Sequence, residues 1–123
     1  MTNKVFDTHL HIIDPAHPLQ ENNGYMPDPF TVADYQERIE GLNIQGGAVV
    51  SGSFQGFDQG YLIDALKALG SNYVGVTQVP GDTEDKRILE LHEAGVRAVR
   101  FNVARGGSAN LDELENLARR VYE

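Results

Sequence analysis

The sequence contains no cysteine and no tryptophan, and basic residues are few. Without cysteine, the chain can form neither a disulfide framework nor a metal site with thiolate ligands. Ten lysines and arginines stand against eighteen aspartates and glutamates, and a net charge of −8 argues against a nucleic-acid partner. No apolar run is long enough to cross a membrane, and the N-terminus lacks the apolar segment of a signal peptide. We therefore expect a soluble, cytoplasmic protein without a membrane partner.

The chain has 123 residues, of which 41% are hydrophobic, enough for one domain spanning residues 1–123. Segments rich in β-branched and aromatic residues alternate with amphipathic segments. The predicted strands are residues 4–12, 47–53, 73–79 and 96–102. Thr31 and Asp34 mark the start of the first predicted helix, and Gly70 marks the end of the second. The third is expected to begin near Asp82 and to end at Gly95, and Asn110 and Glu113 mark the start of the fourth. Their apolar faces include Tyr35, Ile39 and Leu42, then Leu62 and Leu66, then Ile88, Leu89 and Leu91, and finally Leu111, Leu114, Leu117 and Val121.

Strands that alternate with helices predict parallel pairing and an α/β fold. Two arrangements fit: an open doubly wound sheet, or part of a TIM (β/α)8 barrel, which needs roughly 250 residues when complete. All four predicted strands become polar near their carboxyl ends, which is where a barrel carries its active site. This pattern favours (βα)4, half of a TIM barrel with outer helices.

Two histidines, His9 and His11, lie one residue apart in the first predicted strand. Side chains at positions i and i+2 of a strand share a face, about 6.5–7 Å apart along the chain. Two imidazoles so placed can converge on one divalent metal ion or hydrogen-bond one substrate group, although the pair could also be structural. Because the pair precedes a long loop at the end of a strand, we predict His9 and His11 as catalytic residues and metal ligands. Asp7 is expected on the same face, either orienting His9 or satisfied by the backbone.

Arg100 is expected to point to the polar side of the fourth strand, together with Ala98 and Asn102. A buried guanidinium needs an anion, and its planar fork suits a carboxylate, although a structural salt bridge is the alternative. We predict that Arg100 binds a substrate carboxylate. The further substrate-binding candidates are Asn102, Ser51, Ser53, Tyr25 and Arg105. For the two serines the alternative is a packing layer of small residues, and for the tyrosine it is loop packing.

The segment "VFDTHLHIIDP" resembles the first strand of the amidohydrolase superfamily, in which an H-x-H pair opens a (β/α)8 barrel. The segments "GYMPDPFTVADYQERIEGLNIQGGAVVSGSFQGFDQGYLIDALKALG" and "AGVRAVRFNVARGG" resemble the amidohydrolase-related branch that contains 2-pyrone-4,6-dicarboxylate lactonase and sugar lactonases. The resemblance covers essentially the whole chain. It implies the N-terminal half of a barrel enzyme of hydrolase lineage.

The resemblance also implies roles for individual residues. His9 and His11 would bind one divalent metal, zinc or manganese, or would contact the substrate directly, as in metal-free lactonases. Arg100 would hold a carboxylate of a small-molecule substrate. The family's remaining histidines and the aspartate that activates water belong to the second half of the barrel, so we expect the isolated chain to be inactive.

Three functions remain open from the sequence. The chain is the N-terminal portion of a hydrolase in which water attacks a lactone or amide carbonyl polarised by His9 and His11. Alternatively, it is a non-catalytic half-barrel, or an open α/β module that binds small anions. A half-barrel leaves its first and fourth strands unpaired, so we expect its partner to be a second copy or a missing C-terminal half.

Overall fold

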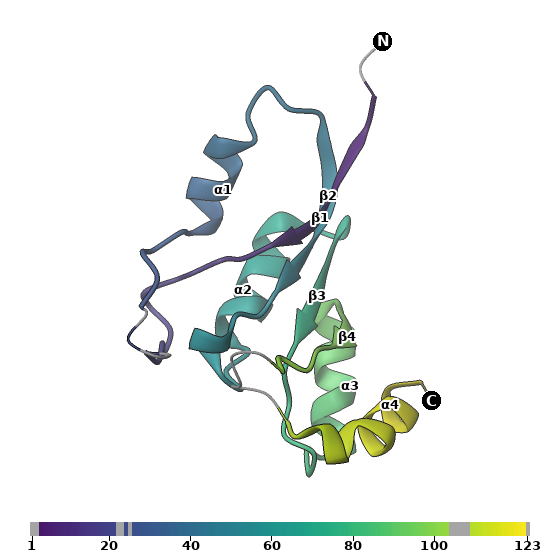
Figure 1. Ribbon diagram of the computed structural model, residues 1–123. Helices are drawn as coiled ribbons and strands as arrows, with labels where there is room; N and C mark the ends of the chain where they lie inside the picture. The colour runs from purple at the N-terminus through teal and green to yellow at the C-terminus, as the bar shows by residue number, and fades with distance from the viewer. Residues whose placement is uncertain (1–2, 22–23, 25, 104–108, 123) are drawn as a thin grey trace.

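Four parallel strands form one sheet in the order β1-β2-β3-β4, so that each strand lies beside its neighbour in the sequence (Figure 1). This computed structural model describes residues 3–21, 24, 26–103 and 109–122. The strands are β1 (Val5–Leu10), β2 (Ile44–Val50), β3 (Tyr73–Thr77) and β4 (Val96–Val99). The helices are α1 (Val32–Arg38), α2 (Gly60–Leu69), α3 (Asp85–Ala94) and α4 (Leu114–Tyr122), with short 3-10 turns η1 (Ser53–Gln55) and η2 (Leu111–Glu113).

All four helices contribute buried side chains to one core cluster, among them Tyr35 of α1, Leu62 of α2, Leu91 of α3 and Leu117 of α4. Right-handed crossovers between neighbouring parallel strands place every helix on the same side of the sheet, as in a (β/α)8 barrel. An open doubly wound sheet instead reverses its strand order and carries helices on both faces. The prediction of four βα units of a TIM barrel is confirmed.

The predicted strands were too long at their carboxyl ends. The last strand residues are Leu10, Val50, Thr77 and Val99. Just beyond the ends of β1 and β3, two main-chain oxygens accept hydrogen bonds from side chains. Gln55 Nε2 donates to the oxygen of Ile12 at 2.8 Å, and Gln59 Nε2 donates to the oxygen of Gln78 at 2.8 Å.

The helix ends follow the cap signals closely. Thr31 and Asp34 form the predicted capping box at the start of α1. Gly70 and Gly95 end α2 and α3 with φ of +98° and +108°, values that favour glycine. The predicted start at Asp82 was wrong, because α3 begins at Asp85. Within the described residues, none of the helices combines the length and the apolarity that a bilayer span requires.

Several leucines predicted on buried faces are exposed. Leu42 lies beyond the end of α1 and is 62% exposed, because the helix stops before its apolar pattern does. Leu89 on α3 is 63% exposed, since it is rotated about 100° away from Ile88 around the helix. The other exposed members of the predicted faces are Leu111, Leu114 and Val121.

Candidate functional site

His9 and His11 come together at the carboxyl end of β1. Their ring centroids are 5.0 Å apart and the ring planes are nearly perpendicular, at 88°. His9 is exposed, whereas His11 is half-buried and lies edge-on to Phe54 of η1, with centroids 6.2 Å apart. The structure therefore places the two imidazoles side by side, as their spacing predicted.

His11 is oriented by the neighbouring strand. Its Nδ1 lies 2.7 Å from the main-chain oxygen of Val50, the last residue of β2. Because a carbonyl oxygen can only accept, Nδ1 carries the hydrogen and Nε2 of the neutral ring keeps its lone pair. This tautomer can bind a cation or accept a proton through Nε2.

Burial lowers the pKa of His11 below its ordinary value, and the hydrogen bond to Val50 opposes this effect. The positive charges of His9 and Arg100 lower the pKa of His11 further. His11 is therefore neutral at neutral pH, which is the form that offers a lone pair. The guanidinium of Arg100 therefore lies close enough for its charge to act on His11.

Arg100 is held at both ends. Its main-chain N–H donates to the oxygen of Thr77 at 2.8 Å, and its Nη1 donates to the oxygen of Ser51 at 2.6 Å. Ser51 directly follows Val50, so two adjacent main-chain oxygens orient His11 and Arg100. By contrast, Arg97 of β4 donates to the oxygen of His92 on α3 at 2.6 Å.

The placement predicted for Asp7 was wrong. β1 has a β-bulge between Asp7 and Leu10. Asp7 pairs with Gly47 of β2 and Leu10 pairs with Val49, so Asp7 lies on the helix-facing side of the sheet together with Leu10. The carboxylate of Asp7 accepts a hydrogen bond from the hydroxyl of Tyr35 on α1 at 3.1 Å. It also accepts the main-chain N–H of His9, at 3.4 Å, and does not orient the ring.

The hydroxyl group of Ser51 is not directed at the histidines. The hydroxyl of Ser51 is fully buried and bonds to Tyr61 and Thr77, because Ser51 continues the helix-facing parity of Val49. Ser53 lies in η1 instead of a strand and is buried. Asn102 is half-buried beyond the end of β4. The two remaining candidates, Tyr25 and Arg105, lie outside the described residues.

Glutamine side chains that the sequence did not suggest hold the loop after β2. Gln55 accepts the N–H of Gly52 at 3.0 Å while its Nε2 bonds to Ile12, next to His11. Gln78 Nε2 donates to the oxygen of Gly56 at 2.9 Å. These glutamines are buried, and glutamine is a residue type that is mostly exposed, so the sequence offers no signal of their burial.

His9 and His11 together offer two imidazole nitrogens as ligands for a metal ion. Among the described histidines, aspartates and glutamates, no group of three could hold a metal ion. Catalytic zinc sites use three protein ligands, so His9 and His11 account for part of such a set. The free Nε2 of His11 and its bonded Nδ1–H have the arrangement that metal-binding histidines show.

The chain is similar in sequence to two curated hydrolases. The 2-pyrone-4,6-dicarboxylate hydrolase of Comamonas testosteroni is 30% identical over 119 residues, which are 94% of this chain and 39% of that protein. The 4-sulfomuconolactone hydrolase of Rhizobium radiobacter is 31% identical over 98 residues, 78% of this chain and 33% of that protein. The chain thus spans between a third and two fifths of the length of these relatives.

Solved structures have the same fold. A protein of Agrobacterium tumefaciens in its apo form matches with a TM-score of 0.85 and 24% identity, over 98% of this chain and 45% of that one. A probable 2-pyrone-4,6-dicarboxylic acid hydrolase of Acinetobacter baumannii, with citric acid bound, matches with a TM-score of 0.80 and 24% identity, over 94% of this chain and 45% of that one. The amidohydrolase family model matches residues 6–123. The chain belongs to the amidohydrolase family.

Proposed function

We propose that this chain supplies the cation-binding and carboxylate-binding part of a lactone hydrolase, in which water attacks the carbonyl of a small carboxylated lactone. The observation that carries the proposal is the pair of adjacent main-chain oxygens, of Val50 and Ser51, that hold His11 and Arg100. A lactone that bears a carboxylate would lie across these two groups. The names of the two curated relatives, a pyrone dicarboxylate hydrolase and a sulfomuconolactone hydrolase, support a lactone substrate with anionic groups.

His9 and His11 would hold a divalent cation, zinc or manganese. The hydrogen bond from Nδ1 of His11 to Val50 leaves Nε2 for the cation, and a neutral Nε2 cannot donate a hydrogen bond to a lactone carbonyl. The tautomer therefore favours cation binding over direct hydrogen bonding to the substrate. When bound, the cation would supply Lewis-acid polarisation of the carbonyl.

Arg100 binds and orients the substrate in this proposal. Among the residues that the structure describes, its guanidinium makes one hydrogen bond, through Nη1 to Ser51, so further N–H groups remain for a carboxylate. A planar guanidinium that is fixed at one end can bind a carboxylate through two parallel hydrogen bonds. Holding the carboxylate in this way fixes the position of the lactone carbonyl relative to His11.

The test is calorimetric titration with 2-pyrone-4,6-dicarboxylate and with citrate, the acid bound to the Acinetobacter baumannii protein. Arg100→Met should weaken binding of both by roughly 10- to 100-fold, as expected for loss of a charge-assisted hydrogen bond. Arg97→Met is the matched control, because Arg97 lies in β4 shortly before Arg100 but bonds to α3. Absence of binding, or equal loss in the two variants, would contradict the carboxylate site.

A zinc titration tests the cation site separately. Zinc should shift the ring ¹⁵N resonances of His9 and His11 and tighten dicarboxylate binding. His11→Asn keeps a donor for Val50 but removes Nε2, so the zinc response should disappear, whereas His92→Asn on α3 should retain it. Dicarboxylate binding that is indifferent to zinc would indicate a small-anion-binding module instead of a hydrolase site.

A further inference from the structure

Three buried hydroxyl groups meet beneath the carboxyl end of the sheet and have no place in the site described so far. Ser51 Oγ lies 2.5 Å from the hydroxyl oxygen of Tyr61 and 3.0 Å from Thr77 Oγ1. Ser51 and Thr77 are 0% exposed and Tyr61 is 1% exposed. The three residues come from the end of β2, the first turn of α2 and the last position of β3, and we call them the hydroxyl cluster.

Burial of hydroxyl groups among apolar side chains is unfavourable unless they bond to one another. In the hydroxyl cluster each group has such a partner. Burial raises the pKa of Tyr61, so its hydroxyl keeps its hydrogen and can donate to Ser51. The cluster therefore fixes the ends of β2 and β3 relative to each other and to α2.

The same two strand residues hold Arg100 through their main chains. The oxygen of Thr77 accepts the main-chain N–H of Arg100, and the oxygen of Ser51 accepts its Nη1. One contact fixes where the side chain begins and the other fixes where the guanidinium lies. The side-chain hydrogen bond between Ser51 and Thr77 links the two residues whose main-chain oxygens hold Arg100.

We propose that Tyr61, Ser51 and Thr77 are positioning residues that set the orientation of the Arg100 guanidinium, and thereby the affinity of the site for a carboxylate. This inference rests on the carboxylate site proposed above. The three residues do not touch the substrate. A shift of Ser51 by a fraction of an ångström would move its oxygen and rotate the guanidinium away from a bound carboxylate.

The first experiment removes hydroxyl groups and measures binding of 2-pyrone-4,6-dicarboxylate. Thr77→Val and Tyr61→Phe should each weaken binding on the order of three- to tenfold, as for the loss of one hydrogen bond. Thr77→Ser should restore it, because serine keeps the hydroxyl. Tyr35→Phe is the matched control: Tyr35 is also a buried tyrosine, 3% exposed, but its hydroxyl bonds to Asp7 and Tyr73, away from Arg100.

A double-mutant cycle separates positioning from general loss of structure. In an Arg100→Met background, Thr77→Val should have no further effect on binding, because no guanidinium remains to be oriented. Equal weakening by Tyr35→Phe and Tyr61→Phe, or an undiminished effect of Thr77→Val without Arg100, would overturn the inference.

The Nε–H NMR signal of Arg100 provides a readout that does not need a ligand. Tyr61→Phe and Thr77→Val should shift and broaden this signal, whereas Tyr35→Phe should leave it unchanged. If no variant and no wild-type sample binds dicarboxylate but the signal responds as expected, the proposed function fails and the positioning of Arg100 stands. An unchanged signal in all three variants would overturn the positioning role.

Discussion

Neutral His11 has a consequence for the stability of the fold. Burial lowers the pKa of His11 in the folded state, so between this lowered pKa and the ordinary value near 6.5 the unfolded chain binds more protons than the folded chain. The free energy of unfolding should therefore fall as the pH decreases below about 6.5. The effect should be small, because the ring is only partly buried and solvent screens it.

Urea unfolding at several pH values, in the presence of a chelator that removes metal ions, measures this effect. His11→Asn should reduce the acid destabilisation, since asparagine keeps a donor for Val50 but does not titrate. His92→Asn is the control, because His92 is exposed on α3. Unfolding curves of His11→Asn that follow the wild type at every pH would contradict the prediction.

Alternation along a strand located some site residues correctly and misplaced others. His9 and His11 share a face, and Arg100 lies close enough for its charge to act on His11. Asp7 and Ser51 were misplaced for different reasons. The bulge in β1 reverses the parity between Asp7 and Leu10, and a single sequence carries no sign of this extra residue. The hydroxyl of Ser51 bonds to that of Tyr61 on α2, and this pairing of residues 10 apart along the chain is a tertiary contact that alternation does not reveal.

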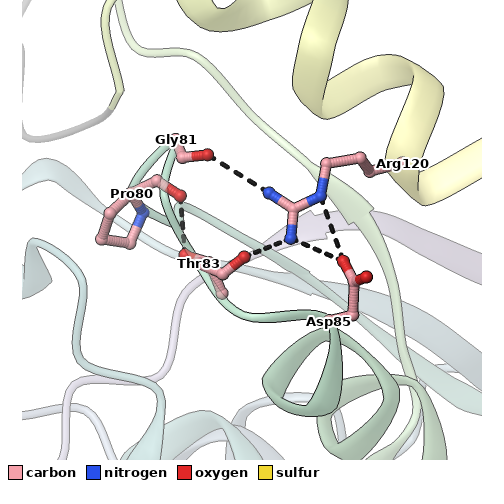
Figure 2. Close-up of polar contacts among 5 residues, drawn as sticks. All are labelled: Pro80, Gly81, Thr83, Asp85 and Arg120. Atoms are coloured by element: carbon pink, nitrogen blue, oxygen red, sulfur yellow. Dashed lines mark hydrogen bonds and ion pairs between the residues drawn. The ribbon is translucent and has the colours of Figure 1, made fainter.

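At the scale of the elements, one arginine joins α4 to the turn before α3. Figure 2 shows Arg120 donating to the oxygens of Gly81 and Thr83 and to the carboxylate of Asp85. The Nη1–Gly81 distance is 3.2 Å and the Nη2–Asp85 distance is 2.7 Å. Thr83 in turn donates through Oγ1 to the oxygen of Pro80 at 2.6 Å, which stabilises the turn. The planar fork of the guanidinium thus reaches three groups at once.

We expect Arg120→Lys to loosen α4, because an ammonium group is a point donor that cannot reach all three partners. The variant should destabilise the docked helix by roughly 1–3 kcal/mol, the range for hydrogen bonds to charged groups. Hydrogen exchange of the amides in α4 measures the change. Arg119→Lys is the control, since Arg119 is 65% exposed and, among the described residues, pairs with Glu115 alone, a contact worth about 0.5 kcal/mol or less. Unchanged amide protection in Arg120→Lys would refute the role given to Arg120.

The elements themselves could largely be predicted, whereas their exposed sides could not. The capping box at Thr31 and the glycines Gly70 and Gly95 mark helix ends by local chemistry that is independent of the rest of the fold. Exposure depends instead on which neighbour covers a face. Leu114 has the helical spacing of a buried residue, yet it is 45% exposed while Leu117 is 1% exposed.

At the scale of the whole molecule, the sheet has two edges that no described strand covers, along β1 and β4. Val5 and Phe6 on β1 are 45% and 52% exposed. Unpaired parallel edges favour pairing with another chain, and closing a barrel removes them. Two copies would bring together eight strands, the number of a TIM barrel. The chain covers 45% of the Agrobacterium tumefaciens protein, which is close to half.

We therefore expect a homodimer in which β1 of each copy lies beside β4 of the other. Each copy carries a net charge of −8, so repulsion should weaken the dimer at low ionic strength and added salt should strengthen it. Phe6→Lys should shift the chain toward monomer, whereas Leu89→Lys, on the exposed side of α3, should not. Sedimentation equilibrium over a range of concentrations measures the mass. A monomer at all concentrations, or an equal effect of the two variants, would contradict the dimer.

The packing of residues 51–59 bears on where the chain tolerates insertion of extra residues. This connection between β2 and α2 is a loop by its backbone, yet it is largely buried and its oxygens and amides bond to Gln55, Gln78 and Arg100. A residue added here would break those contacts and displace the oxygen that holds the guanidinium. The turn at Gly41 is the opposite case, because nothing lies within 4 Å of a side chain built there and Leu42 beside it is exposed. A tag or a fused domain therefore belongs at the amino end of β2, at the opposite end of the strand from the histidines.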